Sequence, residues 1–210
     1  AACSAEGKDV FVTLSAPVTP VEPEEDTYYF IGSDSSGNSF VGSSAGASNG
    51  WNTDPGANVS MDHTVSPAYD YVFDAKGAWR TLGTRQNNDS ETFQGHSLTL
   101  ANGATLQSVG ISGKKIVTVN DLRISGTGGM INSQAQWGKD AQASLVFGGA
   151  ISVDAGSALK FYPCIATVID ASIAGEGSLS LTTMKQYYVK RLTLAGDMSG
   201  FSGSFTAGVD

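Results

Sequence analysis

Two stretches of this chain repeat one pattern of apolar residues around a glycine. "TFQGHSLTLANGATLQ" at residues 92–107 and "AISVDAGSALKF" at 150–161 align on Gly103 and Gly156. Leucine, isoleucine or valine then stands at the same places in both stretches: Leu98 with Ile151, Leu100 with Val153, and Leu106 with Leu159. Each copy predicts a strand with inward apolar side chains, a glycine at a turn that needs positive φ, and a further strand.

The same apolar-x-apolar pattern recurs along residues 92–210. It starts at Leu98, Leu122, Ile151, Leu179 and Leu192, in steps of 24, 29, 28 and 13 residues. Steps of 20 to 50 residues are typical of repeat proteins, in which one repeat buries its apolar face only by stacking on the next. No stretch of this half keeps apolar residues at helical spacing without interruption. We therefore expect an all-β, right-handed, single-stranded parallel β-helix (solenoid) of about four or five coils.

The first part of the chain has a different texture. Residues 1–26 end in "SAPVTPVEPEED" and predict a Pro-rich leader or linker. Residues 27–91 contain "TYYFIG" and "YDYVFDAKGAWRTLG", which predict short strands with Tyr69, Tyr71 and Phe73 on one face and a turn at Lys76-Gly77. We expect these residues to form an N-terminal β cap on the coils of 92–210.

Composition limits the partners. Charged residues make up only 15% of the chain, and the net charge is -8. A basic face that could neutralise phosphates is missing, so nucleic acid is excluded as a partner, and no apolar run is long enough for a transmembrane segment. No cofactor motif is recognisable; "GTGG" at 126–129 lacks the Lys-Ser/Thr of a phosphate loop. Glycans and proteins remain as partners, and the sequence does not fix the oligomeric state.

Polar side chains offer weak catalytic candidates. His63 and His96 are expected to be surface or turn residues, because sequence neighbours such as Asp62 and His63 lie on opposite faces of a strand. Asp70 and Asp74 share a strand face, and carboxylates occur in successive coils at Asp121, Asp154, Asp170 and Glu176. They could supply an acid–base pair for glycoside cleavage, or act as solvent-facing charges that protect turns. Asp34, Ser36 and Asn38 alternate as in a calcium loop, but an Asx-type turn fits them better, and no metal site is predicted.

Aromatic residues are the best candidates for ligand contact. The chain has more of them than the core of a slender solenoid needs, and exposed rings stack on sugars or anchor protein partners. The candidate residues are Trp51, Tyr69, Tyr71, Trp79 and Trp137. The alternative is that the rings of the N-terminal part cover the first coil as a hydrophobic cap.

The two cysteines, Cys3 and Cys164, leave two alternatives. They form a disulfide in an oxidising compartment, or they remain two thiols, one of them buried.

Several segments resemble a known family. "YDYVFDAKGAWRTLG", "IVTVNDLRISGTGGMI" and above all "LAGDMSGFSGSF" at 194–205 are similar to the secreted bacterial proteins, including those of verrucomicrobia, that carry autotransporter-associated β-strand repeats. The resemblance covers roughly residues 27–210. It implies a pectin-lyase-like parallel β-helix, secretion or placement on the outer cell surface, and origin within a longer passenger, although no C-terminal barrel domain follows.

The function expected from these observations is that of a non-enzymatic secreted or cell-surface solenoid, an adhesin that contacts glycans. Two alternatives stay open: a polysaccharide-acting hydrolase or lyase on the same fold, and a structural spacer of a longer surface protein. One fold hosts unrelated functions, so the architecture alone does not choose among them.

Overall fold

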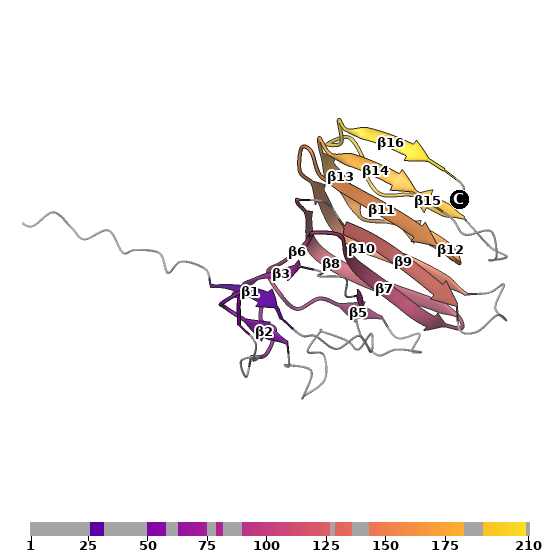
Figure 1. Ribbon diagram of the computed structural model, residues 1–210. Coiled ribbons are helices and arrows are strands. Elements are labelled where there is room, and N and C mark those ends of the chain that lie inside the picture. Colours follow the sequence, from indigo (N-terminus) through magenta and orange to yellow (C-terminus); the bar gives the residue numbers. More distant parts are fainter. Residues whose placement is uncertain are drawn as a thin grey trace, which may run out of the picture.

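The computed structural model describes residues 26–31, 50–57, 63–74, 79–81, 90–126, 129–135, 143–182 and 191–208. Every regular element within these ranges is a β-strand (Figure 1). The strands are β1 (Thr27–Phe30), β2 (Trp51–Asn52), β3 (Asp70–Asp74), β4 (Trp79–Thr81), β5 (Glu91–Thr92), β6 (Ser97–Ala101), β7 (Ala104–Ile111), β8 (Lys114–Ile124), β9 (Gly129–Ala135), β10 (Ser144–Val153), β11 (Ala158–Pro163), β12 (Ala166–Ile169), β13 (Ser172–Gly175), β14 (Ser178–Leu181), β15 (Leu192–Leu194) and β16 (Ser204–Ala207).

The strands stack into a β-solenoid of about four turns, which confirms the predicted all-β parallel architecture. One sheet, here called sheet A, runs in the order β15-β12-β10-β8-β6-β3-β1-β2, with β5 and β13 paired beside it. The other, sheet B, runs β16-β14-β11-β9-β7-β4. All pairings are parallel except the one between β1 and β2. Figure 1 shows the coils rising from β1 to β16 in chain order.

Sheet A bends where each coil passes from one face to the next. The first half of β10 pairs with β12 and its second half with β13, so β10 crosses the bend as one strand. Gly149 lies at this bend with φ of 108°, and a Cβ there would lie 1.8 Å from the carbonyl oxygen of Val119 in the preceding coil. Only glycine permits both this backbone conformation and this close approach.

The predicted apolar ladder is confirmed for its first three members. Leu98, Leu122 and Ile151 stand in register in sheet A, and all are buried. The next member is Ile173, whereas the predicted Leu179 belongs to a ladder of sheet B. Leu192, the last predicted member, is likewise in register with Thr167 on β12 rather than with Ile173. The predicted steps of 28 and 13 residues were therefore wrong, because they joined positions on different faces of the coil.

The alignment of the two repeated stretches holds up to the turn. Gly103 and Gly156 have φ of 79° and 80°, as predicted. Beyond the turn the registers part, because the stretch from β10 to β11 is longer than that from β6 to β7. Leu159 consequently stands in the ladder of Ala104, two positions before that of Leu106.

Connections between the coils vary in length at one corner only. From sheet B back to sheet A, the chain passes through just Ser112–Gly113 or Cys164–Ile165 in two coils. In the other coils residues 82–90, 136–143 and 182–191 occupy the same place. The rungs on either side keep their register in both cases.

The C-terminal signature "LAGDMSGFSGSF" has a structural reason at each glycine of close approach. A Cβ on Gly196 or on Gly203 would lie within 1.9 Å of a carbonyl oxygen of the preceding coil. Between them, Asp197 accepts hydrogen bonds from the backbone N–H and the hydroxyl of Ser199, which closes a tight turn. The turn leads to Phe201, which packs partly buried on the core.

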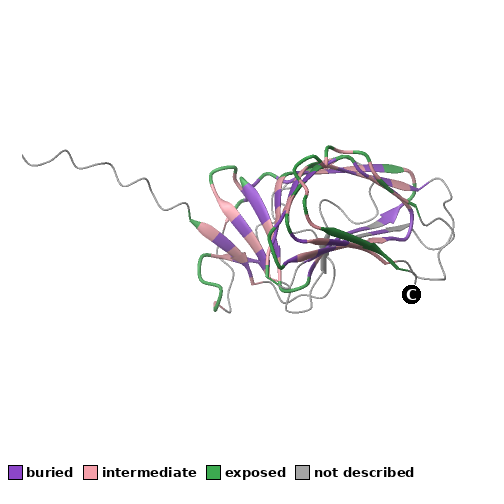
Figure 2. Ribbon diagram, turned by 90° about the horizontal axis from the view of Figure 1, so that it is seen from above, coloured by how far each residue is buried: buried purple, intermediate pink, exposed green. Residues whose placement is uncertain are grey.

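The N-terminal strands share one core with the coils (Figure 2). Along β3, Tyr71 and Phe73 are buried and alternate with half-buried Asp70, Val72 and Asp74, as the sequence predicts. Because β1 and β3 extend sheet A in parallel from β6, residues of the predicted cap continue the stack. The leader up to residue 25, the turn at Lys76-Gly77 and the candidate loop of Asp34, Ser36 and Asn38 lie outside the described residues.

Candidate functional site

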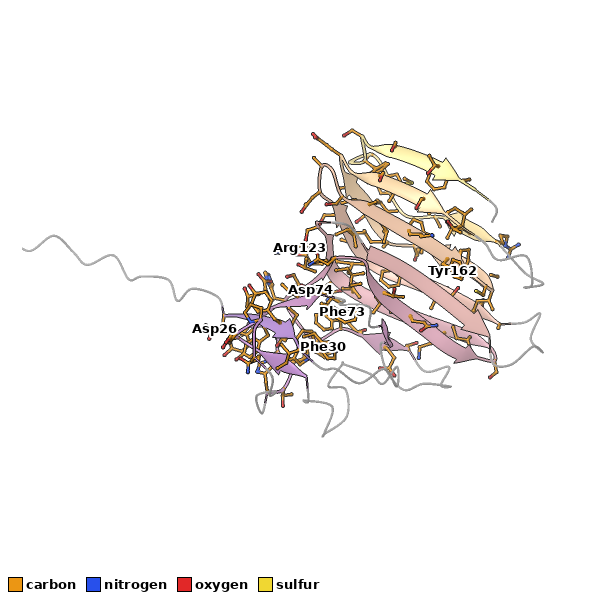
Figure 3. The ribbon with its side chains drawn as sticks, in the orientation of Figure 1. Asp26, Phe30, Phe73, Asp74, Arg123 and Tyr162 are labelled. Atoms are coloured by element: carbon orange, nitrogen blue, oxygen red, sulfur yellow. The ribbon has the colours of Figure 1, made fainter. Side chains whose placement is uncertain are left out.

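A cluster of charged and polar side chains crosses the first three coils on the outer face of sheet A. We call it the outer cluster; its members are Asp70, His96, Ser97, Asp121 and Arg123. The register places Asp70 opposite Ser97 and Thr99 opposite Arg123. Inward residues such as Leu98 and Leu122 alternate with these positions, so the polar side chains share the outer face. Figure 3 places Arg123 where the N-terminal strands join the coils.

A β-bulge sets the position of Asp121. Between Val119 and Leu122, β8 has one residue more than β10 has between Gly149 and Ile151. Such an extra residue redirects neighbouring side chains and is common beside functional sites. Here Asp121 and Arg123 meet: Nε and Nη2 of the guanidinium donate to one carboxylate oxygen of Asp121, at 3.0 and 2.7 Å.

Asp70 is the centre of the outer cluster. Its Oδ1 accepts hydrogen bonds from Nδ1 of His96, at 3.0 Å, and from the hydroxyl of Ser97. Its Oδ2 lies 3.6 Å from Nη1 of Arg123. Partial burial raises the pKa of Asp70, but the hydrogen bonds from Ser97 and His96 and the positive charge of Arg123 together outweigh it. The pKa of Asp70 is therefore below its ordinary value, and the carboxylate is ionised at neutral pH.

These bonds fix the chemistry of His96. An ionised carboxylate only accepts hydrogen bonds, so Nδ1 carries the proton and Nε2 of the neutral ring is an acceptor. The His96 side chain is 52% exposed and that of Arg123 is 41% exposed, so a ligand can reach both. Ser97 bonds to Asp70 and not to the histidine, so Asp70, His96 and Ser97 do not form a relay that would activate the hydroxyl. The arrangement is suited to hydrogen bonding with a ligand.

The predicted aromatic candidates lie mostly in the core. Trp51 and Tyr71 are completely buried, and Tyr69 is partly buried against them. Trp79 is on β4, its side chain outside the described set, and Trp137 lies outside the described residues. The positions of Trp51 and Tyr71 match the alternative in which N-terminal rings cover the first coil.

Tyr71 is the centre of this aromatic cap. Its ring contacts Trp51 at 4.9 Å and Phe93 at 5.4 Å, measured between ring centroids. Its hydroxyl accepts the backbone N–H of Ser66 at 2.8 Å and lies 2.7 Å from Nε2 of His63. Burial raises the pKa of Tyr71 to about 12, so the hydroxyl keeps its proton at neutral pH.

His63 is sandwiched into the same cap and is not a catalytic residue of the outer cluster. Its ring stacks on Tyr28 with 3.6 Å between centroids, and burial lowers its pKa. The neutral ring therefore accepts a hydrogen bond from the Tyr71 hydroxyl.

The carboxylates separate into different environments. Asp70 and Asp74 do share a face of β3, but four residues of strand span about 13 Å, too far for an acid–base pair. Asp154 and Glu176 come directly after Val153 and Gly175, which are in register, so they stand at the same corner of adjacent coils. Both are exposed, as is Asp170 at the sheet A bend. The expectation that no carboxylate pair recurs at one coil position was wrong for Asp154 and Glu176.

Metal and membrane sites can be assessed for the described residues only. Among them, no three His, Cys, Asp or Glu side chains converge as metal ligands would. No helix in the described ranges is long and apolar enough to cross a membrane. Cys164 is buried, and Cys3 lies outside these ranges, so the disulfide stays a prediction.

The outer cluster carried a sequence signal that single motifs do not show. Asp70 and Ser97 are 27 residues apart, close to the 24 residues between Leu98 and Leu122 that mark one coil. Polar residues one coil apart become neighbours once the register is known. Comparisons of the chain with known protein families, with curated proteins and with solved structures found no match to any of them.

Proposed function

We propose that this chain is a secreted or cell-surface β-solenoid that contacts neutral glycans through the outer cluster. The observation that carries the proposal is the exposed row of alternating charge from His96 over Asp70 to Arg123, on the face of a sheet. Sugars present pairs of hydroxyl groups, each both a donor and an acceptor. The row offers matching groups, because carboxylates accept, guanidinium donates and His96 Nε2 accepts.

Charge favours a neutral sugar over an acidic one. The outer cluster holds two carboxylates and one guanidinium, and the whole chain carries -8. A polyanionic glycan would approach a surface of its own sign, which slows its association. The hydroxyls of Thr99 and Ser152 stand on either side of Arg123 in register and lengthen the polar strip.

The test is a glycan array with plant and mucin-type glycans, probed with the purified chain and matched variants. We expect selective binding that is lost in His96→Ala and in Arg123→Gln. Lys114→Gln is the control, because Lys114 is an exposed cation on the same strand, β8, outside the outer cluster. Binding that survives both cluster variants would place the glycan elsewhere, and a blank array at high protein concentration would refute the proposal.

One observation favours the hydrolase or lyase alternative. Asp154 and Glu176 stand in adjacent coils, with backbones about 4.8 Å apart, which brings their carboxyl groups into the range that glycosidases use. Reducing-sugar release from a panel of polysaccharides tests it, with Asp154→Asn and Glu176→Gln as variants. Activity lost in both variants would establish the enzyme, and no release from any polysaccharide would exclude it for that panel.

A further inference from the structure

The last coil of the solenoid ends in an uncovered rung. It consists of β15, β16 and the residues between them, and we call it the terminal rung. β15 and β16 are the end strands of sheets A and B, and each pairs in parallel on one side. Figure 1 shows β16 as the outermost strand at the C-terminal end, and Figure 2 shows it exposed along its length.

The apolar side chains of the terminal rung show what the missing cover would bury. Phe205 stands in one ladder with Leu159 and Leu179, both fully buried, yet Phe205 is 46% exposed. It is the large hydrophobic side chain that stands out as exposed among the described residues. Further apolar side chains of this rung pack on the core while remaining partly exposed: Leu192, Leu194, Met198 and Phe201.

The edge of β16 also lacks the features that prevent strand pairing. Its sequence, Ser-Phe-Thr-Ala, has no charge and no proline, and its pairing with β14 has no bulge. Edge strands that avoid association usually carry such features. The opposite end of sheet A differs, because the two-residue strand β2 closes it in antiparallel orientation over buried Trp51.

We propose that the terminal rung binds a second copy of this chain, with β16 pairing antiparallel to the partner's β16 across a two-fold axis. The two-fold axis brings Phe205 of the two copies together and buries both. A head-to-tail stack is disfavoured, since the N-terminal end of the solenoid is closed by its aromatic cap. A two-fold contact uses one self-complementary surface and closes after two copies.

Charge complementarity selects this arrangement. Arg191 directly precedes β15, Asp197 follows it, and both are exposed. Antiparallel two-fold pairing sets the start of β15 in one copy beside its end in the other. Arg191 of each copy then lies near the partner's Asp197, so two opposite-charge contacts flank the apolar centre.

The test is sedimentation velocity of the full chain from micromolar to several hundred micromolar, for the wild type and three variants. We expect a concentration-dependent dimer that Phe205→Lys weakens about tenfold or more, since it places two cations at the two-fold axis. Ser180→Lys is the matched control, because it adds the same charge on β14, one coil inside the edge. Arg191→Glu should weaken the dimer and reduce its dependence on salt.

Thermal unfolding monitored by circular dichroism shows whether each variant remains folded. A monomer at every concentration would overturn the proposal. So would a dimer that persists in folded Phe205→Lys, or one that Ser180→Lys weakens equally. The outcome is independent of the glycan array, because the terminal rung and the outer cluster share no residue.

Discussion

Arg123 in the third coil reaches across the second coil to Asp70 in the first, with 3.6 Å between Nη1 and Oδ2. The same carboxylate holds His96 and Ser97 of the second coil. Three coils are thereby joined on the outer face by side chains, in addition to the hydrogen bonds between their backbones. The exposed outer cluster therefore has a structural role that can be measured separately from ligand binding.

Replacing Asp70 with Asn should flatten the acid limb of stability. The pKa of Asp70 is lowered in the folded state, so its stabilisation is present above the unfolded pKa, about 3.9, and is lost as the pH falls through the folded value. We expect the variant to be less stable than the wild type at pH 7, and the difference to shrink towards pH 2. Urea unfolding at pH 7, 4 and 2.5 measures it. Asp74→Asn, on the same face of β3, is the control, and an equal effect there would contradict the assignment.

Replacing His63 with Phe should remove a second pH dependence, in a higher window. Burial lowers the folded pKa of His63, so the wild type keeps the stabilisation above the unfolded pKa, about 6.5, and loses it as the pH falls through the folded value. The groups around the ring are Tyr28, Tyr69 and Tyr71, which stay neutral in this window, with Asp26 near Tyr28.

The measurement is the melting temperature between pH 7.5 and 4.5. Phenylalanine keeps the stack on Tyr28 and cannot be protonated, so the variant should show a smaller fall in melting temperature than the wild type. His96→Gln removes the other histidine and serves as the comparison. An unchanged pH slope in His63→Phe would show that His63 does not limit stability in acid.

Removing the hydroxyl of Tyr71 should destabilise the protein by about 1–3 kcal/mol. The hydroxyl is buried and serves both the backbone N–H of Ser66 and Nε2 of His63, and Phe leaves these groups without that partner. Tyr29→Phe is the control, because Tyr29 lies on the outward side of β1. Chemical denaturation gives the free energies of unfolding, and equal values for the two variants would contradict the role of the hydroxyl.

Two glycines with positive φ should differ sharply in their tolerance of alanine. Gly156 has φ of 80° and open space around its missing Cβ, so Gly156→Ala should cost only the backbone strain, about 1–2 kcal/mol. Gly175 has φ of 109°, and a Cβ there would lie 2.2 Å from the carbonyl oxygen of Val153. Gly175→Ala should cost more than about 3 kcal/mol, since the coil must move apart. Similar costs in denaturant titrations would show that the approach of the coils is looser than described.

The sequence predicts the architecture well where one rule governs all coils. Alternation along β3, positive φ at Gly103 and Gly156, and the ladder of Leu98, Leu122 and Ile151 follow from strand periodicity and turn chemistry. The prediction fails where faces must be told apart. A two-residue alternation looks the same in sheet A and sheet B, so Leu179 was assigned to the ladder that Ile173 completes.

The candidate site was harder to predict, because it depends on register and burial together. Trp51 and Tyr71 are large rings with polar edges, a composition that suits a binding surface as well as a cap, and only the packing shows them to be buried. His96 becomes notable only when coil spacing brings it to Asp70. Lys115 shows the same limit: it occupies an inward position of β8 and is buried, although its charge predicts exposure.

Variable connections at a single corner give this architecture a direction in which it can evolve. Between β7 and β8 the chain needs only Ser112–Gly113, whereas residues 136–143 fill the equivalent place between β9 and β10. Segments gained or lost there leave the apolar ladders untouched, so selection can act on them apart from folding. The same corner is the natural place to graft a foreign peptide for display.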